Sequence, residues 1–159
     1  MTAFPHLFAP LALGAHTVPN RLFFPPHGTS LPERGQVGER MVAYHAARAA
    51  GGVGMIVIEG MSMHESFDVE SGYVLAGRPG VVPGFARLAE AVQAHGTKLL
   101  GQLFHPGAAM RTTHDGSRRP VFSASDVPFE RYGLIPVPAS RALLAELAGA
   151  YAKAAGHMR

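Results

Sequence analysis

The feature that most constrains the fold of this sequence is a threefold alternation of strand-like runs with helical segments. Residues 54–58 (GMIVI) form a continuous apolar run, as expected of a strand that is covered on both faces. Residues 39–50 are rich in alanine and are followed by Gly51-Gly52, which predicts a helix with a glycine C-cap. The order of strands and helices is 21–24, 39–50, 54–58, 84–95, 98–105 and 141–159. This alternation predicts parallel strands joined by right-handed crossovers, and therefore an α/β fold.

The third strand-like segment, residues 98–105 (KLLGQLFH), ends in polar chemistry. Gly101 inside the segment suggests that another group approaches the backbone closely. The primary amide of Gln102 both donates and accepts hydrogen bonds, so it could bind the edge of a heterocycle that carries an N–H beside a carbonyl. The alternative is a glutamine that ends the strand in water.

Small or polar residues follow every predicted strand. They are Pro26, His27 and Gly28 after the first strand, Glu59 and Gly60 after the second, and Gln102 and His105 at the end of the third. Active sites are built at this end of the strands both in α/β barrels and in doubly wound sheets. No GxGxxG motif opens a helix, which counts against a dinucleotide-binding fold.

The composition is that of a globular protein and excludes several classes of function. The chain has 159 residues, of which 47% are hydrophobic and 16% charged, enough for one domain with a core. The net charge of +3 is scattered rather than arranged as a basic stripe, so we expect no nucleic-acid partner. No apolar run has the length of a membrane span and no signal peptide opens the chain, so we expect a cytoplasmic protein without a membrane partner. The absence of cysteine excludes disulfides and a cysteine nucleophile within these residues.

The segments outside the strands and helices include a predicted hairpin and two long loops. Residues 11–13 and 17–18 are predicted to pair around Gly14-Ala15 as a lid or plug ahead of the main fold. The loops cover residues 61–83 and 106–139, and loops of such length are usually functional or mobile. We therefore expect an N-terminal hairpin at 1–19 and the βα units at 20–159.

The remaining polar residues give weaker indications of a site. His45 is predicted to lie on the helix surface, and Glu59, which follows the second strand, could be a base. His105 and His114 have no third ligand at a suitable spacing, so no metal site is predicted. Neither a GxSxG motif nor a P-loop is present, which leaves serine hydrolysis and phosphoryl transfer without support.

With these residues considered together, the chain resembles the Old Yellow Enzyme family of FMN-dependent ene-reductases, including the branch of 2,4-dienoyl-CoA reductase and trimethylamine dehydrogenase. The resemblance covers nearly the whole chain. It is carried by the segments LFAP, LGAHTVPNR, YHAARAAGGVGMIVIEG, AHGTKLLGQLFHPG, SASDVP and YAKAAG. The order and spacing of these motifs is specific, whereas no single motif is.

The resemblance implies an eight-stranded (β/α) barrel with FMN at its C-terminal mouth and no catalytic residue among those present. By position, the cofactor-binding residues are Pro26, His27, Gly28, Gly60 and Gln102. Pro26 and His27 match the segment that touches the flavin ring, Gly28 a position that tunes the flavin, and Gly60 a small residue that leaves room for the ring. Gln102 matches the glutamine that hydrogen-bonds the pyrimidine edge of the flavin. The resemblance also implies that Glu59 is a structural residue at the end of its strand and that His105 positions its loop. The implied reaction passes a hydride from NAD(P)H through FMN to an activated alkene or a related electron-poor small molecule.

Three positions depart from the family pattern. His27 stands where methionine or leucine is common, and Gly28 stands where threonine, cysteine or alanine is common. Thr29 could supply a hydroxyl one position later, as in the dienoyl-CoA reductase branch. Ala108 stands where arginine is common. These departures bear on the tuning of the flavin more than on its binding.

The length of the chain leads to a second hypothesis. A barrel of this type takes about 250 residues, and the predicted elements amount to about three βα units. We therefore expect the N-terminal portion of a truncated (β/α)8 barrel, which supplies the flavin-ring half of the site. The alternative is a non-catalytic half-barrel that lacks the substrate and phosphate sites. On either hypothesis the expected partner is a second copy of the chain or the missing C-terminal half.

Overall fold

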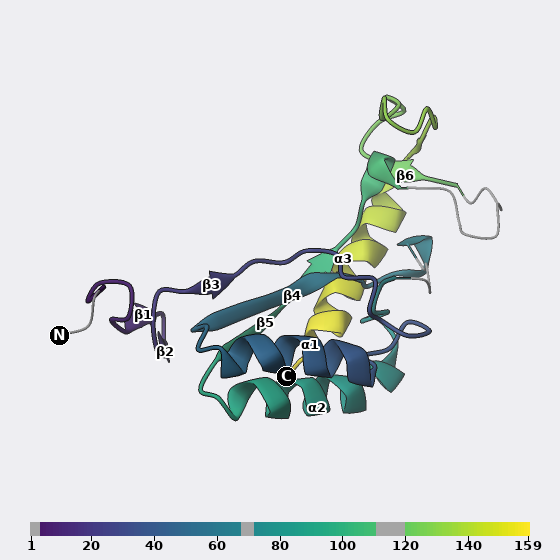
Figure 1. Ribbon diagram of the computed structural model, residues 1–159. Helices are drawn as coiled ribbons and strands as arrows, with labels where there is room; N and C mark the ends of the chain where they lie inside the picture. The colour runs from purple at the N-terminus through teal and green to yellow at the C-terminus, as the bar shows by residue number, and fades with distance from the viewer. Residues whose placement is uncertain (1–3, 68–71, 111–119) are drawn as a thin grey trace.

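The structure, a computed structural model, describes residues 4–67, 72–110 and 120–159. A three-stranded sheet is formed by β3 (Phe23–Phe24), β4 (Met55–Ser62) and β5 (Lys98–Phe104). Each strand is followed by a helix, in the order α1 (Glu39–Ala50), α2 (Val82–Gln93) and α3 (Arg141–His157). The three βα units expected from the sequence are therefore present (Figure 1).

The strands of this sheet are parallel and lie in the order β3-β4-β5. Phe23 pairs with Met55 across the first two strands, and Met55 pairs with Lys98 across the second and third. The prediction of a parallel α/β sheet is thus confirmed.

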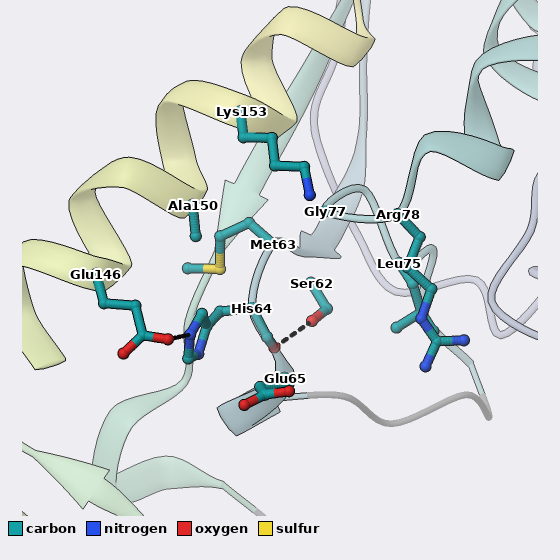
Figure 2. Close-up of a pocket in the computed structure, with 10 residues that line it drawn as sticks. All are labelled: Ser62, Met63, His64, Glu65, Leu75, Gly77, Arg78, Glu146, Ala150 and Lys153. Atoms are coloured by element: carbon teal, nitrogen blue, oxygen red, sulfur yellow. Dashed lines mark hydrogen bonds and ion pairs between the residues drawn. The ribbon is translucent and has the colours of Figure 1, made fainter.

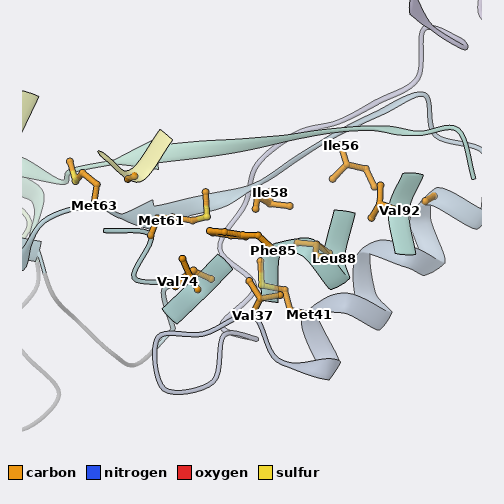
Figure 3. Packing of buried hydrophobic residues seen from close by; sticks show 14 residues of the cluster. Val37, Met41, Ile56, Ile58, Met61, Met63, Val74, Phe85, Leu88 and Val92 are labelled. Atoms are coloured by element: carbon orange, nitrogen blue, oxygen red, sulfur yellow. The ribbon is translucent and has the colours of Figure 1, made fainter. Parts of the chain in front are cut away.

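The hydrophobic core lies between the sheet and its helices. α1 and α2 pack side by side on one face of β4 and β5 (Figure 1). Figure 3 shows Phe85 and Leu88 of α2 between Ile58 of β4 and Met41 of α1. α3 completes this layer through the buried Ala154. Burial of this apolar surface is the main term that stabilises the fold.

The opposite face of the sheet is largely uncovered. Leu99 and Leu103 of β5 pack against the core, whereas the intervening Leu100 is 42% exposed. Phe23 at the start of β3 is 50% exposed. The expectation of a strand covered on both faces was made for residues 54–58, and in β4 one face is buried at Ile56 and Ile58 while the other is half-buried at Met55 and Val57. An uncovered parallel sheet with helices on one side is the geometry of a barrel segment, whose open face corresponds to the barrel interior.

The N-terminal hairpin lies at the amino-terminal end of the strands. β1 (Leu11–Leu13) pairs antiparallel with β2 (His16–Val18), as the sequence predicted. The Asn20 side chain, two residues beyond β2, donates to the carbonyl of Gly52 at 2.8 Å, just before β4 begins. The hairpin is therefore a plug at the end of the sheet opposite the predicted site, and not a lid over that site.

Several predicted boundaries are wrong. β4 continues to Ser62, four residues beyond the apolar run, so Glu59 and Gly60 lie inside the strand and not after it. β5 ends at Phe104, one residue before the predicted end at His105, and it contains Gln102 as predicted. α2 begins at Val82, two residues earlier than predicted, because a proline at the first turn of a helix sacrifices no hydrogen bond.

Short elements occupy the long loops, in which little regular structure was predicted. η1 (Glu65–Phe67) and η2 (Pro79–Val81) lie between β4 and α2. η3 (Gly107–Ala109) and the parallel pair β6 (Phe122–Ser123) and β7 (Val137–Pro138) lie between β5 and α3. Among the described residues, no helix combines the length and the apolar character needed to cross a membrane.

The N-terminus of α3 provides a first testable prediction. The Ser140 hydroxyl oxygen accepts a hydrogen bond from the Leu143 backbone N–H at 3.1 Å, as its predicted N-cap role requires. Replacing Ser140 with alanine is expected to lower the free energy of unfolding by about 1 kcal/mol, measured by urea denaturation. Ser140→Asp retains an acceptor and should remain near the wild-type value. Equal losses in both variants would show that the cap does not hold the helix end.

Candidate functional site

The predicted site residues lie toward the carboxyl ends of the three parallel strands, which meet at one edge of the sheet. Pro26, His27 and Gly28 follow β3, Gly60 lies in the second half of β4, and Gln102 lies near the end of β5. The fold thus brings together segments that are separated by up to about half of the chain.

Gly60 and Gln102 are brought together directly, because they are partners across β4 and β5. A β-carbon at Gly60 would lie 3.1 Å from the β-carbon of Phe104, closer than side-chain carbons normally approach. Only glycine therefore fits at this position without displacing Phe104. The close approach predicted at Gly101 is also present, since a β-carbon there would meet Met158 and Met61.

The Gln102 amide is available for a ligand. Its side chain is exposed, and within the described ranges no side chain or backbone group hydrogen-bonds it. It belongs to the uncovered face of the sheet, because the alternate residues Gly101 and Leu103 turn toward Met61 and the core. An amide in this position offers a donor and an acceptor side by side.

The loop after β3 is tied to β4 by Glu59, which is 1% exposed. The Thr29 hydroxyl donates to Glu59 Oε1 at 2.8 Å, and the Thr29 backbone N–H donates to Glu59 Oε2. The Thr29 hydroxyl oxygen in turn accepts from the Leu31 N–H at 3.1 Å. Thr29 therefore directs its hydroxyl toward Glu59, and Glu59 has the structural role that the sequence predicted.

The three predicted residues in this loop are placed differently from one another. Pro26 is half-buried, whereas Gly28 is exposed with open space where a side chain would begin. The imidazole of His27 turns toward α1, where its Nε2 lies 2.8 Å from the hydroxyl of Tyr44. Its ring also packs edge-on against Phe24 at 5.2 Å between centroids. The His27 ring therefore fastens the loop to α1, and a contact with the flavin ring remains a prediction for this segment.

The prediction that His45 lies on the surface of α1 is wrong. Its side chain is 1% exposed, and neither ring nitrogen has a hydrogen-bond partner in the described structure. Burial lowers the pKa of His45 to about 4, and the neighbouring Arg48 and His27 add to this shift. His45 is therefore a neutral core residue, packed edge-on against Phe24 and Tyr44.

A chain of hydrogen bonds that the sequence did not predict runs from β5 to α3. His105 Nδ1 accepts from the Gly107 N–H, and its Nε2 lies 3.0 Å from the Ser66 hydroxyl. Ser66 also bonds His64 Nδ1 at 2.8 Å, and His64 Nε2 bonds Glu146 at 3.1 Å. Burial, and secondarily His64, lowers the pKa of His105. His105 is therefore a residue that positions its loop, as expected.

This chain borders a cavity of about 460 Å³ between the end of β4 and α3. Figure 2 shows His64 and Glu146 in contact at one side, with Lys153 and Arg78 farther along the lining. The cavity mixes both signs of charge and contains none of the predicted site residues. In the described ranges no three His, Asp or Glu side chains are placed to hold a metal ion, and His114 lies outside these ranges.

The residues at the strand ends have the chemistry that the predicted flavin ring would need. The exposed amide of Gln102, which has no hydrogen-bond partner in the described part of the chain, offers the donor and acceptor that the pyrimidine edge of a flavin requires. Gly60 lies beside it on the adjacent strand, and Gly28 leaves open space at the end of β3. The Gln102 amide would hold the ring by directional hydrogen bonds. The backbone at Gly60 and Gly28, where no side chain intervenes, would provide surfaces for the ring.

Comparison with known proteins places the chain among flavin oxidoreductases. It is 30% identical over 149 residues to a metal reductase from Desulforamulus reducens, covering 94% of this chain and 22% of that protein. It is 34% identical over 142 residues to an NADH oxidase from Thermoanaerobacter brockii, covering 86% of this chain and 21% of the oxidase. The chain thus spans about a fifth of the length of these relatives.

Solved structures share the fold. A 2-naphthoyl-CoA reductase matches with a TM-score of 0.87 and 24% identity, over 98% of this chain and 26% of that one. The old yellow enzyme homologue from Zymomonas mobilis matches with a TM-score of 0.83 and 22% identity, over 96% of this chain and 45% of that one. The model of the NADH:flavin oxidoreductase / NADH oxidase family matches residues 6–136. Since this match covers most of the chain, and the Old Yellow Enzyme fold covers nearly all of it, the protein belongs to the NADH:flavin oxidoreductase / NADH oxidase family.

Proposed function

We propose that this chain supplies the flavin-ring half of the FMN site in an NAD(P)H-dependent oxidoreductase. The single observation that carries the proposal is the pairing of Gly60 with Gln102 across β4 and β5. That pairing places an amide with no hydrogen-bond partner among the described residues beside a glycine at which a β-carbon would crowd Phe104. Membership of the family supplies the identity of the cofactor.

The chain's own groups would bind and orient the ring. The Gln102 amide would donate to and accept from the pyrimidine edge, and Pro26 and Gly28 would provide the surface after β3. His27 would hold that surface against α1 through Tyr44. When bound, FMN would supply hydride transfer from NAD(P)H to an electron-poor small molecule, for which an activated alkene is our proposed class.

A second candidate function is a half-barrel that has no catalytic activity of its own. The observation that favours it is the uncovered face of the sheet, on which Phe23 and Leu100 are 50% and 42% exposed. Apolar side chains exposed on an open parallel sheet are usually covered by further structure. We propose that further strands, from a longer polypeptide or a second copy, would cover this face.

Replacing Gln102 with leucine tests the first proposal. The probes are FMN and lumiflavin, a flavin ring without the ribityl phosphate, because the assigned residues contact the ring alone. Loss of two hydrogen bonds of ~0.7 kcal/mol each should raise the dissociation constant for lumiflavin about tenfold, measured by quenching of flavin fluorescence.

Gln93→Leu is the matched control, since Gln93 is an exposed glutamine at the end of α2. It should leave the dissociation constant unchanged. If wild-type protein binds neither probe, the half-barrel is the better description. If Gln102→Leu binds lumiflavin as tightly as wild type, the amide does not recognise the ring.

A further inference from the structure

We infer that Glu59 and Thr29 are positioning residues that set the distance between the loop after β3 and the Gly60–Gln102 pair. This inference rests on the proposed function, because the surfaces whose distance they set are the proposed contacts of the flavin ring. Glu59 is the residue before Gly60, and Thr29 is the residue after Gly28. The contact between Glu59 and Thr29 therefore joins the two parts of the site. Each of the two residues is adjacent in sequence to a proposed contact of the flavin ring.

The contact uses both oxygens of the carboxylate. The hydroxyl and the backbone N–H of Thr29 each donate to a different oxygen of Glu59. Hydrogen bonds to an ionised acceptor are roughly twice as strong as those between neutral groups. Because two donors of Thr29 bind the two oxygens of Glu59, the contact fixes the orientation of the loop. One hydrogen bond alone would let the loop rotate.

Because Glu59 is buried, its carboxylate needs the contact with Thr29. Glu59 is 1% exposed, so its carboxylate has no access to bulk water, and a buried carboxylate without partners is strongly unfavourable. The burial and the two donors also argue against Glu59 as a proton-transferring base, because both oxygens are already engaged. Its role is therefore to hold the loop.

Two irregularities of the backbone occur at this contact. The register of β4 against β5 shifts between Ile58 and Gly60, so Glu59 occupies a β-bulge. Ser30, next to Thr29, has a φ of 55°, a left-handed conformation that is costly for a residue with a side chain. A bulge redirects side chains beside functional sites. The bulge turns Glu59 toward the loop, and its contact with Thr29 holds the loop in its strained form.

The test is a Thr29→Val substitution, which keeps the shape of the side chain and removes the hydroxyl. We expect its dissociation constant for FMN to rise about tenfold through the loss of a charge-assisted hydrogen bond. We also expect the visible absorption spectrum of the bound flavin to shift, and the Thr29 amide hydrogen to exchange faster. Thr29→Ser restores the hydroxyl and should restore all three properties.

Thr97→Val is the matched control. Thr97 is also 1% exposed, and its hydroxyl donates to the Val53 carbonyl at 2.7 Å, at the amino-terminal end of the sheet. This variant should lose stability as Thr29→Val does but bind FMN with wild-type affinity and spectrum. A Thr29→Val protein with wild-type affinity and spectrum would overturn the positioning role while leaving the proposed function intact. Absence of FMN binding by wild-type protein would overturn both.

Discussion

Replacing Leu88 with alanine is expected to lower the free energy of unfolding by about 2–5 kcal/mol. Leu88 is fully buried in α2 and belongs to the cluster that joins both helices to the sheet. Figure 3 shows Leu88 beside Phe85, with Ile58 of β4 toward the sheet and Met41 of α1 on the other side. Because these elements are packed from several sides, they cannot close fully over the missing atoms, and a cavity adds to the lost transfer free energy.

Leu144→Ala is the matched control for this prediction. Leu144 also lies in a helix, α3, but is 53% exposed, so the substitution changes helix propensity by the same amount without opening the core. Urea denaturation followed by circular dichroism should show a loss below ~0.5 kcal/mol for this variant. Similar losses for the two variants would show that the cluster around Leu88 does not dominate the stability of the fold.

The sequence predicts the regular parts of this fold because local chemistry determines them. The predicted and observed bounds of α1 coincide at Glu39–Ala50 because alanines favour the helix and Gly51 ends it. The hairpin β1–β2 follows from Gly14, whose φ of 58° suits the turn. The apolar runs, and the glycines that separate them, were sufficient to predict the parallel sheet.

The second half of β4 could not be predicted, because its hydrogen-bond partners are distant in the sequence. The apolar pattern stops at Ile58, but the strand continues to Ser62 because its last residues pair with residues 102–104 of β5. Its polar groups also have partners outside the strand. Glu59 bonds Thr29, thirty positions away, and the Ser62 backbone N–H donates to Val74 across a loop. A single sequence does not show these pairings, and the same limit concealed the contact between His64 and Glu146.

The residues of the candidate site also divide into those that the sequence could predict and those that it could not. Gln102 could be selected from the sequence because its residue type supplies an amide that both donates and accepts hydrogen bonds. Gly60 was selected because the resemblance implies a small residue at this position. The orientation of His27 toward Tyr44 depends on where α1 packs, which periodicity does not give. His45 was placed on the surface because a histidine on a helix is more often exposed than buried without a partner.

His45 leads to the second large prediction, a loss of stability in acid. The folded protein holds its pKa at about 4, whereas in the unfolded chain it returns to its ordinary value near 6.5. Between these values the unfolded chain binds more protons, so stability falls as the pH falls from 6.5 to 4. The difference of 2.5 pKa units corresponds to a loss of about 3 kcal/mol. The loss from this residue is complete below about pH 4 and absent above pH 6.5.

His45→Leu should remove this loss, because leucine has no proton to bind. At pH 7 the variant should also be more stable than wild type, by about 1–3 kcal/mol, since two buried nitrogens without partners are replaced by carbon. Urea denaturation at pH 7, 6, 5 and 4 would measure both effects. His95→Leu, at an exposed histidine beyond the end of α2, should keep the wild-type dependence on pH.

A substitution at Arg48 tests whether the loss of stability in acid comes from His45. The Arg48 guanidinium stacks on the ring of Tyr44 at 3.2 Å and acts with burial to keep His45 neutral. Replacing Arg48 with methionine should therefore raise the pKa of His45, so that the loss of stability becomes smaller and is complete at a higher pH. In the His45→Leu background, the effect of the Arg48 substitution should no longer depend on pH. Acid sensitivity that persists unchanged in His45→Leu would assign it to another group, for which His105, whose pKa is also lowered by burial, is the next to test.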